Sequence, residues 1–178
     1  FLNTCTSALE ISVRYLNLKK NDEVIVPCET FIATGMAVSS QGGKVVFANI
    51  NPKTFCIDLD EIKKRTTKKT KALMLVHFGG YMPHDILEIK KYCKRKKISI
   101  VEDCAHAIGS EVRGLKAGSI GTSGCFSFFS TKTITTGEGG MLTTNDKKLY
   151  NFALSLRERG RDWKKNGELY SIGWRSCR

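Results

Sequence analysis

The chain lacks an apolar run long enough to cross a lipid bilayer, and it does not open on the basic and apolar pattern of a secretion signal. No low-complexity tract, internal repeat or linker interrupts it. Its seven cysteines include no C-x-x-C pair, a spacing typical of zinc and redox sites. These absences predict one globular unit in the cytoplasm, with free thiols and no bound metal.

Acidic residues are scarce beside basic ones, 17 against 29, which gives a formal net charge of +12. Most of the excess lies in Lys63 to Lys71 and in Lys90 to Lys97, among helix-forming residues and without an aromatic platform. That pattern favours solvated helix faces over a nucleic-acid-binding surface. Attraction of an anionic substrate, such as a nucleotide diphosphate, is the second interpretation.

Strand-like and helical segments alternate along the 178 residues, of which 41% are hydrophobic. Helical periodicity falls at Ser7 to Leu18, Thr30 to Ser40, Leu59 to Lys64, Asp85 to Lys96 and Asp146 to Arg157. Apolar strand-like runs fall at Val24 to Val26, Lys44 to Ala48, Ala72 to His77, Ile98 to Glu102, Cys125 to Phe129 and Gly140 to Thr144. The alternation predicts an α/β fold of three layers, with a mostly parallel central sheet between two layers of helices.

Three residues suited to one aldehyde cofactor follow or end these strands. Asp103 follows an apolar run, at the carboxyl end of a strand where open α/β sheets bind their ligands. Ser127 lies in a later strand and could bind a phosphate. Lys132 follows that strand among aromatic, hydroxyl and glycine residues, surroundings that suit a lysine that forms a Schiff base.

These residues belong to a longer pattern. Glu102-Asp103-Cys104-Ala105-His106-Ala107 is followed by Phe126-Ser127-Phe128-Phe129-Ser130-Thr131-Lys132 and then by Gly137-Glu138-Gly139-Gly140. The pattern resembles the core of the DegT/StrS family of sugar-nucleotide aminotransferases, which use pyridoxal 5′-phosphate (PLP) and have the aspartate aminotransferase fold (fold type I). The resemblance implies that Lys132 forms a Schiff base with PLP and that Asp103 pairs with the pyridine nitrogen. It places His106 near the phenolic oxygen and Ser127 at the phosphate.

The resemblance extends over essentially the whole chain. The small residues from Thr4 to Leu9 resemble the family's turn into a helix, which implies that Thr6 and Ser7 help to bind the phosphate at the helix amino end. Phe31 lies in a segment similar to the one whose aromatic residue stacks on the cofactor ring. His77 ends a strand and either packs in the core or lines the site.

The resemblance also implies that residues 1–178 are the large cofactor-binding domain of a longer protein. We expect this domain to be incomplete at its amino terminus and the small carboxyl-terminal domain of the family to be absent. Ser176 stands where the family usually has an asparagine that reaches the neighbouring subunit's cofactor in a homodimer.

The implied activity is a ping-pong transfer of an amino group from glutamate or glutamine to a nucleotide-linked keto-sugar, in polysaccharide or lipopolysaccharide biosynthesis. Related enzymes of the same fold leave alternatives open. Sugar dehydratases carry histidine in place of the lysine, whereas an aminohydroxybenzoate-type synthase keeps the lysine. A non-enzymatic regulatory module and a basic nucleic-acid-binding module are alternatives of another class. We expect no nucleic-acid or membrane partner.

Overall fold

A computed structural model describes residues 1–158, 160–162, 168 and 169. Its main sheet has the strand order β2-β1-β3-β4-β7-β8, in which β8 alone runs antiparallel to its neighbour. These strands are β1 (Glu23–Pro27), β2 (Lys44–Ala48), β3 (Thr70–Val76), β4 (Ser99–Asp103), β7 (Ser123–Ser127) and β8 (Gly140–Thr143). Two short antiparallel pairs complete the strands: β5 (Glu111–Val112) with β6 (Leu115–Lys116), and β9 (Arg161–Asp162) with β10 (Glu168–Leu169).

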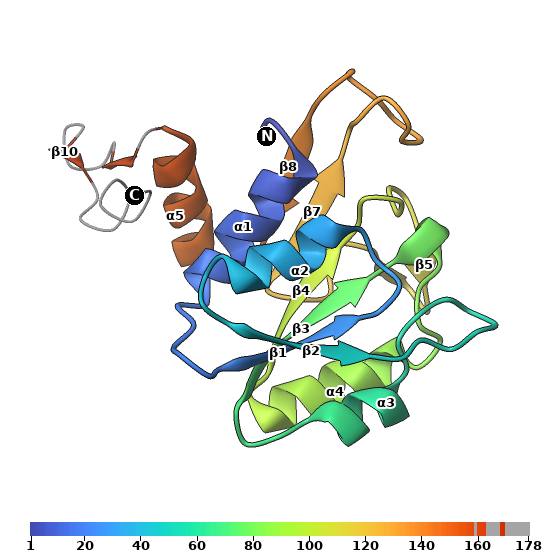
Figure 1. The fold of residues 1–178 in the computed structure, drawn as a ribbon. Helices are drawn as coiled ribbons and strands as arrows, with labels where there is room; N and C mark the ends of the chain where they lie inside the picture. Colours follow the sequence, from blue (N-terminus) through green and yellow to red (C-terminus); the bar gives the residue numbers. More distant parts are fainter. Residues whose placement is uncertain (159, 163–167, 170–178) are drawn as a thin grey trace.

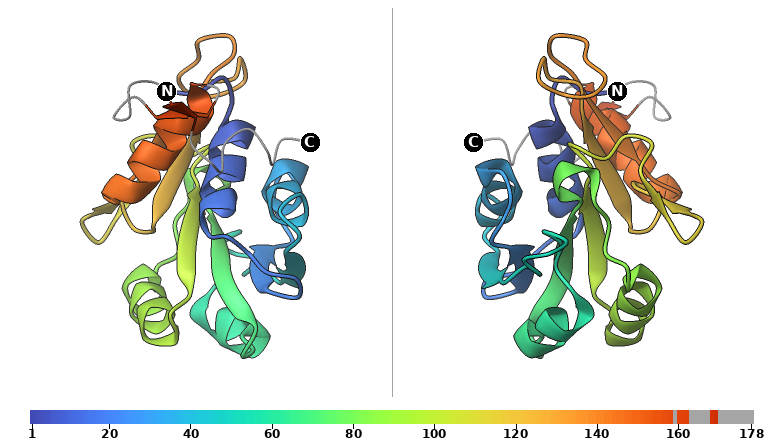
Figure 2. Two further views of the ribbon diagram at one scale, coloured as in Figure 1. Left: turned by 90° about the vertical axis from the view of Figure 1, so that its left-hand side faces the viewer. Right: turned by 90° about the vertical axis from the view of Figure 1, so that its right-hand side faces the viewer.

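Helices cover both faces of the sheet, as Figures 1 and 2 show. They are α1 (Cys5–Tyr15), α2 (Ile32–Ser39), α3 (Leu59–Arg65), α4 (Ile86–Lys96) and α5 (Lys147–Arg157), with a 3₁₀ turn η1 (Phe78–Gly80) after β3. α1 and α2 lie over one face, and α3 and α4 lie over the other (Figure 1). The three-layer α/β fold with a mostly parallel sheet is confirmed.

Side-chain alternation along the strands builds two cores. Val24 and Met74 point to the α1 and α2 side, whereas Ile25 and Leu73 point to the α3 and α4 side. Because β1 and β3 are buried on both faces, they read in the sequence as continuous apolar runs. No helix in the described part of the chain is long and apolar enough to span a membrane.

The boundaries of α1 differ most from those the sequence predicts. The helix begins at Cys5 rather than Ser7, because the Thr4 hydroxyl accepts a hydrogen bond from the Ser7 N–H and caps the first turn. It ends at Tyr15 rather than Leu18, since Asn17 adopts a left-handed backbone with φ of 51°.

Other elements differ from the predictions by one or two residues at an end, or were not predicted. α2 begins at Ile32 instead of Thr30, because Phe31 has an extended backbone at the cap position. β7 runs from Ser123 to Ser127 rather than from Cys125 to Phe129. The β5 and β6 hairpin was not predicted, since four strand residues leave no periodic pattern.

Candidate active site

A cavity of about 440 Å³ opens at the carboxyl ends of β3, β4 and β7, where parallel sheets bind ligands. The amino ends of α1 and α2 and the loop between β7 and β8 complete its wall. Six of the seven residues proposed from the sequence line it: Thr6, Phe31, Asp103, His106, Ser127 and Lys132. The fold therefore gathers residues that are up to 126 positions apart in the chain (6 to 132) around one space.

Asp103 is the last residue of β4 and lies on the cavity side of the sheet with an exposed fraction of 6%. Its Oδ1 accepts a hydrogen bond from the Ala105 N–H at 3.1 Å, and its Oδ2 accepts one from the Thr34 hydroxyl at 2.8 Å. On either side of Asp103, Val76 of β3 and Cys125 of β7 are its register partners. The carboxylate is thus fixed in direction and retains lone pairs for a ligand in the cavity.

Lys132 lies in the loop after β7, half-buried against the same cavity. No described residue forms a hydrogen bond or ion pair with its amine. Burial raises the pKa of the Cys5 thiol, and the positive charge of Lys132 opposes that rise, so the charge acts within the cavity. The amine is therefore available to a ligand.

His106 lies beside the cavity with its ring in edge contact with Phe78, at 5.6 Å between centroids. Partial desolvation lowers its pKa, the nearby Lys132 charge lowers it further, and the Asp103 charge opposes the change. Its Nδ1 accepts a hydrogen bond from the Gly79 N–H at 3.2 Å, so in the neutral ring the proton lies on Nε2. His106 can consequently donate a hydrogen bond from Nε2.

The amino end of α1 supplies a site for an anion. Thr4, Cys5 and Thr6 line the cavity, and the N–H groups of the first helical turn have no acceptor within the helix. Ser127 lines the same cavity, while its hydroxyl accepts a 3.3 Å hydrogen bond from the Phe129 N–H. A phosphate at this end would lie at the positive end of the helix dipole, beside the hydroxyl side chains of Thr6 and Ser127.

Ser7 is the one proposed residue whose side chain lies elsewhere. It lines a second cavity on the other side of α1, and its hydroxyl donates to Asn3 Oδ1 at 2.7 Å. Its N–H donates to the Thr4 hydroxyl as part of the helix cap. These contacts leave Ser7 away from the space that holds the other six residues.

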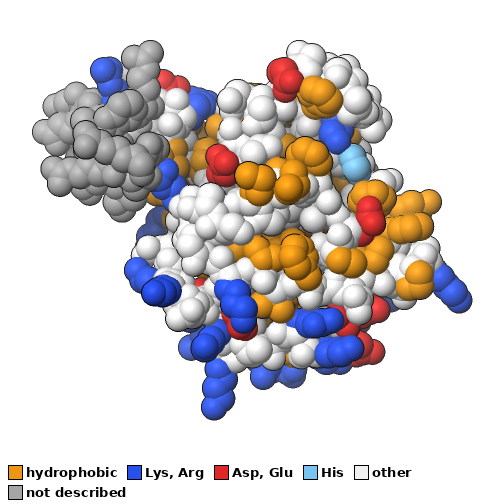
Figure 3. Space-filling model, in the orientation of Figure 1, with side chains coloured by type: hydrophobic (Ala, Val, Ile, Leu, Met, Phe, Trp, Pro, Cys, Tyr) orange, Lys and Arg blue, Asp and Glu red, His pale blue; other side chains and the backbone are white. Residues whose placement is uncertain are grey.

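Phe31 stands at the mouth of the cavity with an exposed fraction of 72%. It occupies the cap position of α2, whose next exposed side chains are Ile32 and Met36. Apolar side chains gather on this face of the molecule (Figure 3). An aromatic ring held so openly is free to stack on a planar ligand.

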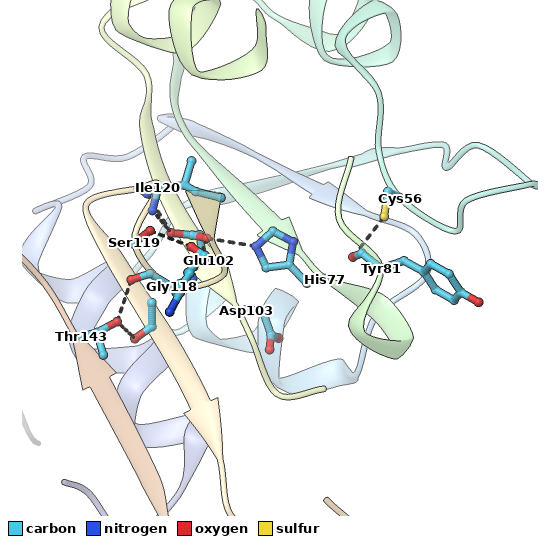
Figure 4. Close-up of polar contacts among 12 residues, drawn as sticks. Cys56, His77, Tyr81, Glu102, Asp103, Gly118, Ser119, Ile120 and Thr143 are labelled. Atoms are coloured by element: carbon cyan, nitrogen blue, oxygen red, sulfur yellow. Dashed lines mark hydrogen bonds and ion pairs between the residues drawn. The ribbon is translucent and has the colours of Figure 1, made fainter. Parts of the chain in front are cut away.

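A buried hydrogen-bond network under the cavity was not predicted from the sequence. Glu102, 0% exposed, accepts hydrogen bonds from the N–H groups of Gly118, Ile120 and Gly121 at 2.7 to 2.9 Å. It also accepts one from Nε2 of His77 at 3.0 Å, as Figure 4 shows. His77 therefore packs mainly in the interior, although part of it borders the cavity.

His77, Glu102 and Cys104 bring their possible ligand atoms within 4.8 Å of one another, a spacing that a metal site could have. However, Glu102 already accepts four hydrogen bonds, and His77 uses its Nε2 in one of them. Burial also raises the pKa of the Cys104 thiol, which disfavours the thiolate that metals bind. Glu102 and His77 therefore belong to a network of hydrogen bonds, with the Cys104 thiol beside it.

Comparison with known proteins identifies the family and the fold of the chain. A model of the DegT/DnrJ/EryC1/StrS aminotransferase family matches residues 1–174. The chain belongs to this family. The family expected from the Asp103, Ser127 and Lys132 pattern is thereby confirmed.

Members of the DegT/DnrJ/EryC1/StrS family resemble this chain over nearly all of its length. The GDP-perosamine synthase of Escherichia coli O157:H7 is 41% identical over 155 residues, which are 87% of this chain and 42% of that protein. A crystal structure of an aminotransferase from Psychrobacter cryohalolentis superposes with a TM-score of 0.88 at 33% identity, covering 97% of this chain and 45% of the other. NtdA from Bacillus subtilis, solved with bound cofactor PMP, gives 0.85 at 30% identity, covering 97% and 39%.

The chain spans less than half the length of these relatives. Ser176, which stands at the usual asparagine of the family, lies outside the described residues. Within them, Asp103, Ser127 and Lys132 all border one cavity, and so does Glu138 of the glycine-rich segment.

Proposed function

We propose that the intact protein is a PLP-dependent aminotransferase that moves an amino group from glutamate or glutamine to a nucleotide-linked keto-sugar. In this proposal, residues 1–178 form its cofactor-binding domain. One observation carries the proposal: a buried carboxylate, an available lysine amine and a helix amino end surround one cavity. Its relatives support it, since the one from Escherichia coli is named for making a GDP-linked amino sugar.

The chemical groups that line the cavity fit the phosphate, the ring and the aldehyde of PLP. The amino end of α1, Thr6 and Ser127 would hold the phosphate, and Asp103 would hold the protonated pyridine nitrogen. Phe31 would stack on the ring, and Nε2 of His106 would donate to its phenolic oxygen. When bound, PLP supplies an electron sink that stabilises negative charge at the carbon that loses a proton.

The positions of the side chains support the roles that we propose for them. The Lys132 amine would be the nucleophile that holds PLP before the amino donor arrives. Once the donor has displaced it, the free amine would take the proton from the α-carbon of the donor and deliver it to C4′ of the cofactor. Asp103 keeps its charge directed at one atom, because the Ala105 N–H and the Thr34 hydroxyl fix both of its oxygens. In the second half of the ping-pong cycle, Lys132 moves a proton in the opposite direction while the keto-sugar takes up nitrogen.

The proposal includes a homodimer, because Phe31, Ile32 and Met36 present an exposed apolar surface beside the cavity. A second copy of the protein would cover these side chains and close the mouth. We also place the protein in the cytoplasm, where the six free cysteines of the described part would stay reduced. Biosynthesis of polysaccharide or lipopolysaccharide would use the amino sugar that it makes.

The test is the visible absorption spectrum of the intact protein purified with PLP, before and after borohydride reduction. We expect a yellow band that reduction removes, and a pyridoxyl label that peptide mapping finds on Lys132. Lys132→Ala should bind PLP without the label and should lose all detectable transamination between glutamate and GDP-linked keto-sugars.

Lys116→Ala is the matched control, because Lys116 is exposed on β6 and does not border the cavity. It should keep the band, the label and the turnover rate. Wild-type turnover in Lys132→Ala would refute the proposal. If the protein removed a hydroxyl from the sugar without adding nitrogen, the dehydratase alternative would replace it.

A further inference from the structure

A chain of two hydroxyl groups reaches Asp103 from the start of α2. Thr34 is 0% exposed, and its hydroxyl donates to Asp103 Oδ2 at 2.8 Å. The Thr30 hydroxyl lies 2.7 Å from that of Thr34, and Thr30 borders the cavity. The chain therefore connects the buried acid to the edge of the cavity through side chains alone.

The direction of this chain follows from counting protons. A threonine hydroxyl has a single proton, and Thr34 gives its proton to Asp103. In the contact between the two hydroxyls, Thr34 must therefore accept, and Thr30 must donate. The Thr30 oxygen then has lone pairs left for a hydrogen-bond donor in the cavity.

In the described structure, Thr34 supplies the only hydrogen bond to the Asp103 carboxylate that comes from outside the loop of Asp103 itself. The other comes from the Ala105 N–H, two residues along the chain. The hydrogen bond from the Ala105 N–H holds Oδ1. The hydrogen bond from the Thr34 hydroxyl holds Oδ2 and so sets the rotation of the carboxylate about Oδ1. Hydrogen bonds to an ionised group are among the stronger ones, and burial strengthens this one further.

We infer that Thr34 is a positioning residue that orients the Asp103 carboxylate toward PLP, and that Thr30 fixes the direction of the Thr34 hydroxyl. This inference rests on the proposed function. Because Thr30 directly precedes Phe31, the same chain also links the acid to the ring at the mouth of the cavity. α2 thus contributes to the site through its first turn as well as through its apolar face.

The first measurement is the affinity of the intact protein for PLP, by absorbance titration. Thr34→Val keeps the shape of the side chain without its hydroxyl, and we expect about tenfold weaker binding and a changed absorption band. Thr34→Ser restores the hydroxyl and should return the affinity to within about twofold of the wild type. Ser39→Ala is the matched control, since it removes an exposed hydroxyl from the same helix.

The second measurement separates positioning from packing by a double-mutant cycle. If Thr34 acts through Asp103, then Thr34→Val should not weaken PLP binding further in an Asp103→Asn background. Thr30→Val should weaken binding when Thr34 is present and have no effect in the Thr34→Val background. Equal losses with and without the Asp103 carboxylate would assign Thr34 to packing and overturn the inference, as would wild-type affinity in Thr34→Val.

The same cycle of Thr34→Val and Asp103→Asn, measured by urea unfolding without PLP, tests the role of Thr34 separately from the proposed function. Coupling between the two changes would establish the hydrogen bond independently of any cofactor. Additive changes would overturn the inference even if PLP binds to Lys132. If the wild-type protein failed to bind PLP, the proposed function would fail, and the role inferred for Thr34 would fail with it.

Discussion

Two neighbouring acids, Glu102 and Asp103, have opposite surroundings because strand residues alternate between the faces of a sheet. The Asp103 carboxylate faces the cavity and accepts two hydrogen bonds, whereas the Glu102 carboxylate faces the α3 and α4 side and accepts four. Figure 4 shows the Glu102 and His77 side chains directed toward each other, with that of Asp103 directed away from them. One acid is available to a ligand, and the other fixes the turn that leads into β7.

Glu102→Gln should lower the free energy of unfolding by about 3 kcal/mol, measured by urea denaturation. An amide has one acceptor oxygen, so its NH₂ group would face the N–H groups that now point at the carboxylate.

Glu111→Gln, on the exposed side of β5, is the control and should change stability by less than about 0.5 kcal/mol. If the two substitutions had equal effects, the network would not have the stabilising role that its geometry indicates.

The amino end of α1 and the start of β8 fit together closely enough to require glycine. Leu2 and Gly140 exchange two backbone hydrogen bonds, at 2.8 and 2.9 Å. A Cβ on Gly140 would overlap the backbone of Thr4 and Cys5, which border the cavity. The glycine thus lets β8 approach the helix end that we propose for the phosphate.

Gly140→Ala should lower the free energy of unfolding by about 2 kcal/mol and also weaken PLP binding, because the backbone of the helix end must move. The measurements are urea unfolding and PLP titration of the same preparation.

For Gly35→Ala, within α2, we expect the opposite change in stability. A Cβ there meets nothing within 4 Å, so alanine should raise the free energy of unfolding by about 0.5 to 1 kcal/mol. If Gly140→Ala were as well tolerated as Gly35→Ala, the backbone of β8 could not lie as close to the start of α1 as the structure shows.

Strand polarity separates the basic end of α4 from the cavity. The cavity lies at the carboxyl ends of the strands, whereas the basic end of α4, with Lys94 and Lys96, precedes the amino end of β4. Five residues of β4 then extend roughly 15 Å toward Asp103, which exceeds the Debye length of about 8 Å at physiological salt. Lys and Arg side chains are visible along the α3 and α4 side in Figure 3. The solvated helix faces expected from the sequence fit this arrangement better than attraction of a substrate.

Replacing Lys94 and Lys96 together by glutamine should leave PLP affinity within about twofold of the wild type at physiological salt. Both side chains are exposed, so the fold should tolerate the change. A tenfold loss of affinity, matched by a steep dependence on salt concentration, would show that the distant charge does guide the anionic cofactor.

The sequence by itself determined the layer architecture, because periodic apolar segments specify strands and helices locally, and a βα alternation leaves few ways to bury them. It also determined the family and pointed to Asp103, Ser127 and Lys132, since their spacing lies within one continuous stretch of chain.

Only the tertiary structure revealed the partners of these residues. Thr34 reaches Asp103 across 69 positions, and Glu102 receives N–H groups from a turn with no periodic pattern. The Ser7 side chain turned away from the cavity because Thr4 caps the helix two residues earlier than the sequence predicted. Such contacts depend on where distant backbones meet in space, which no local pattern of side chains specifies.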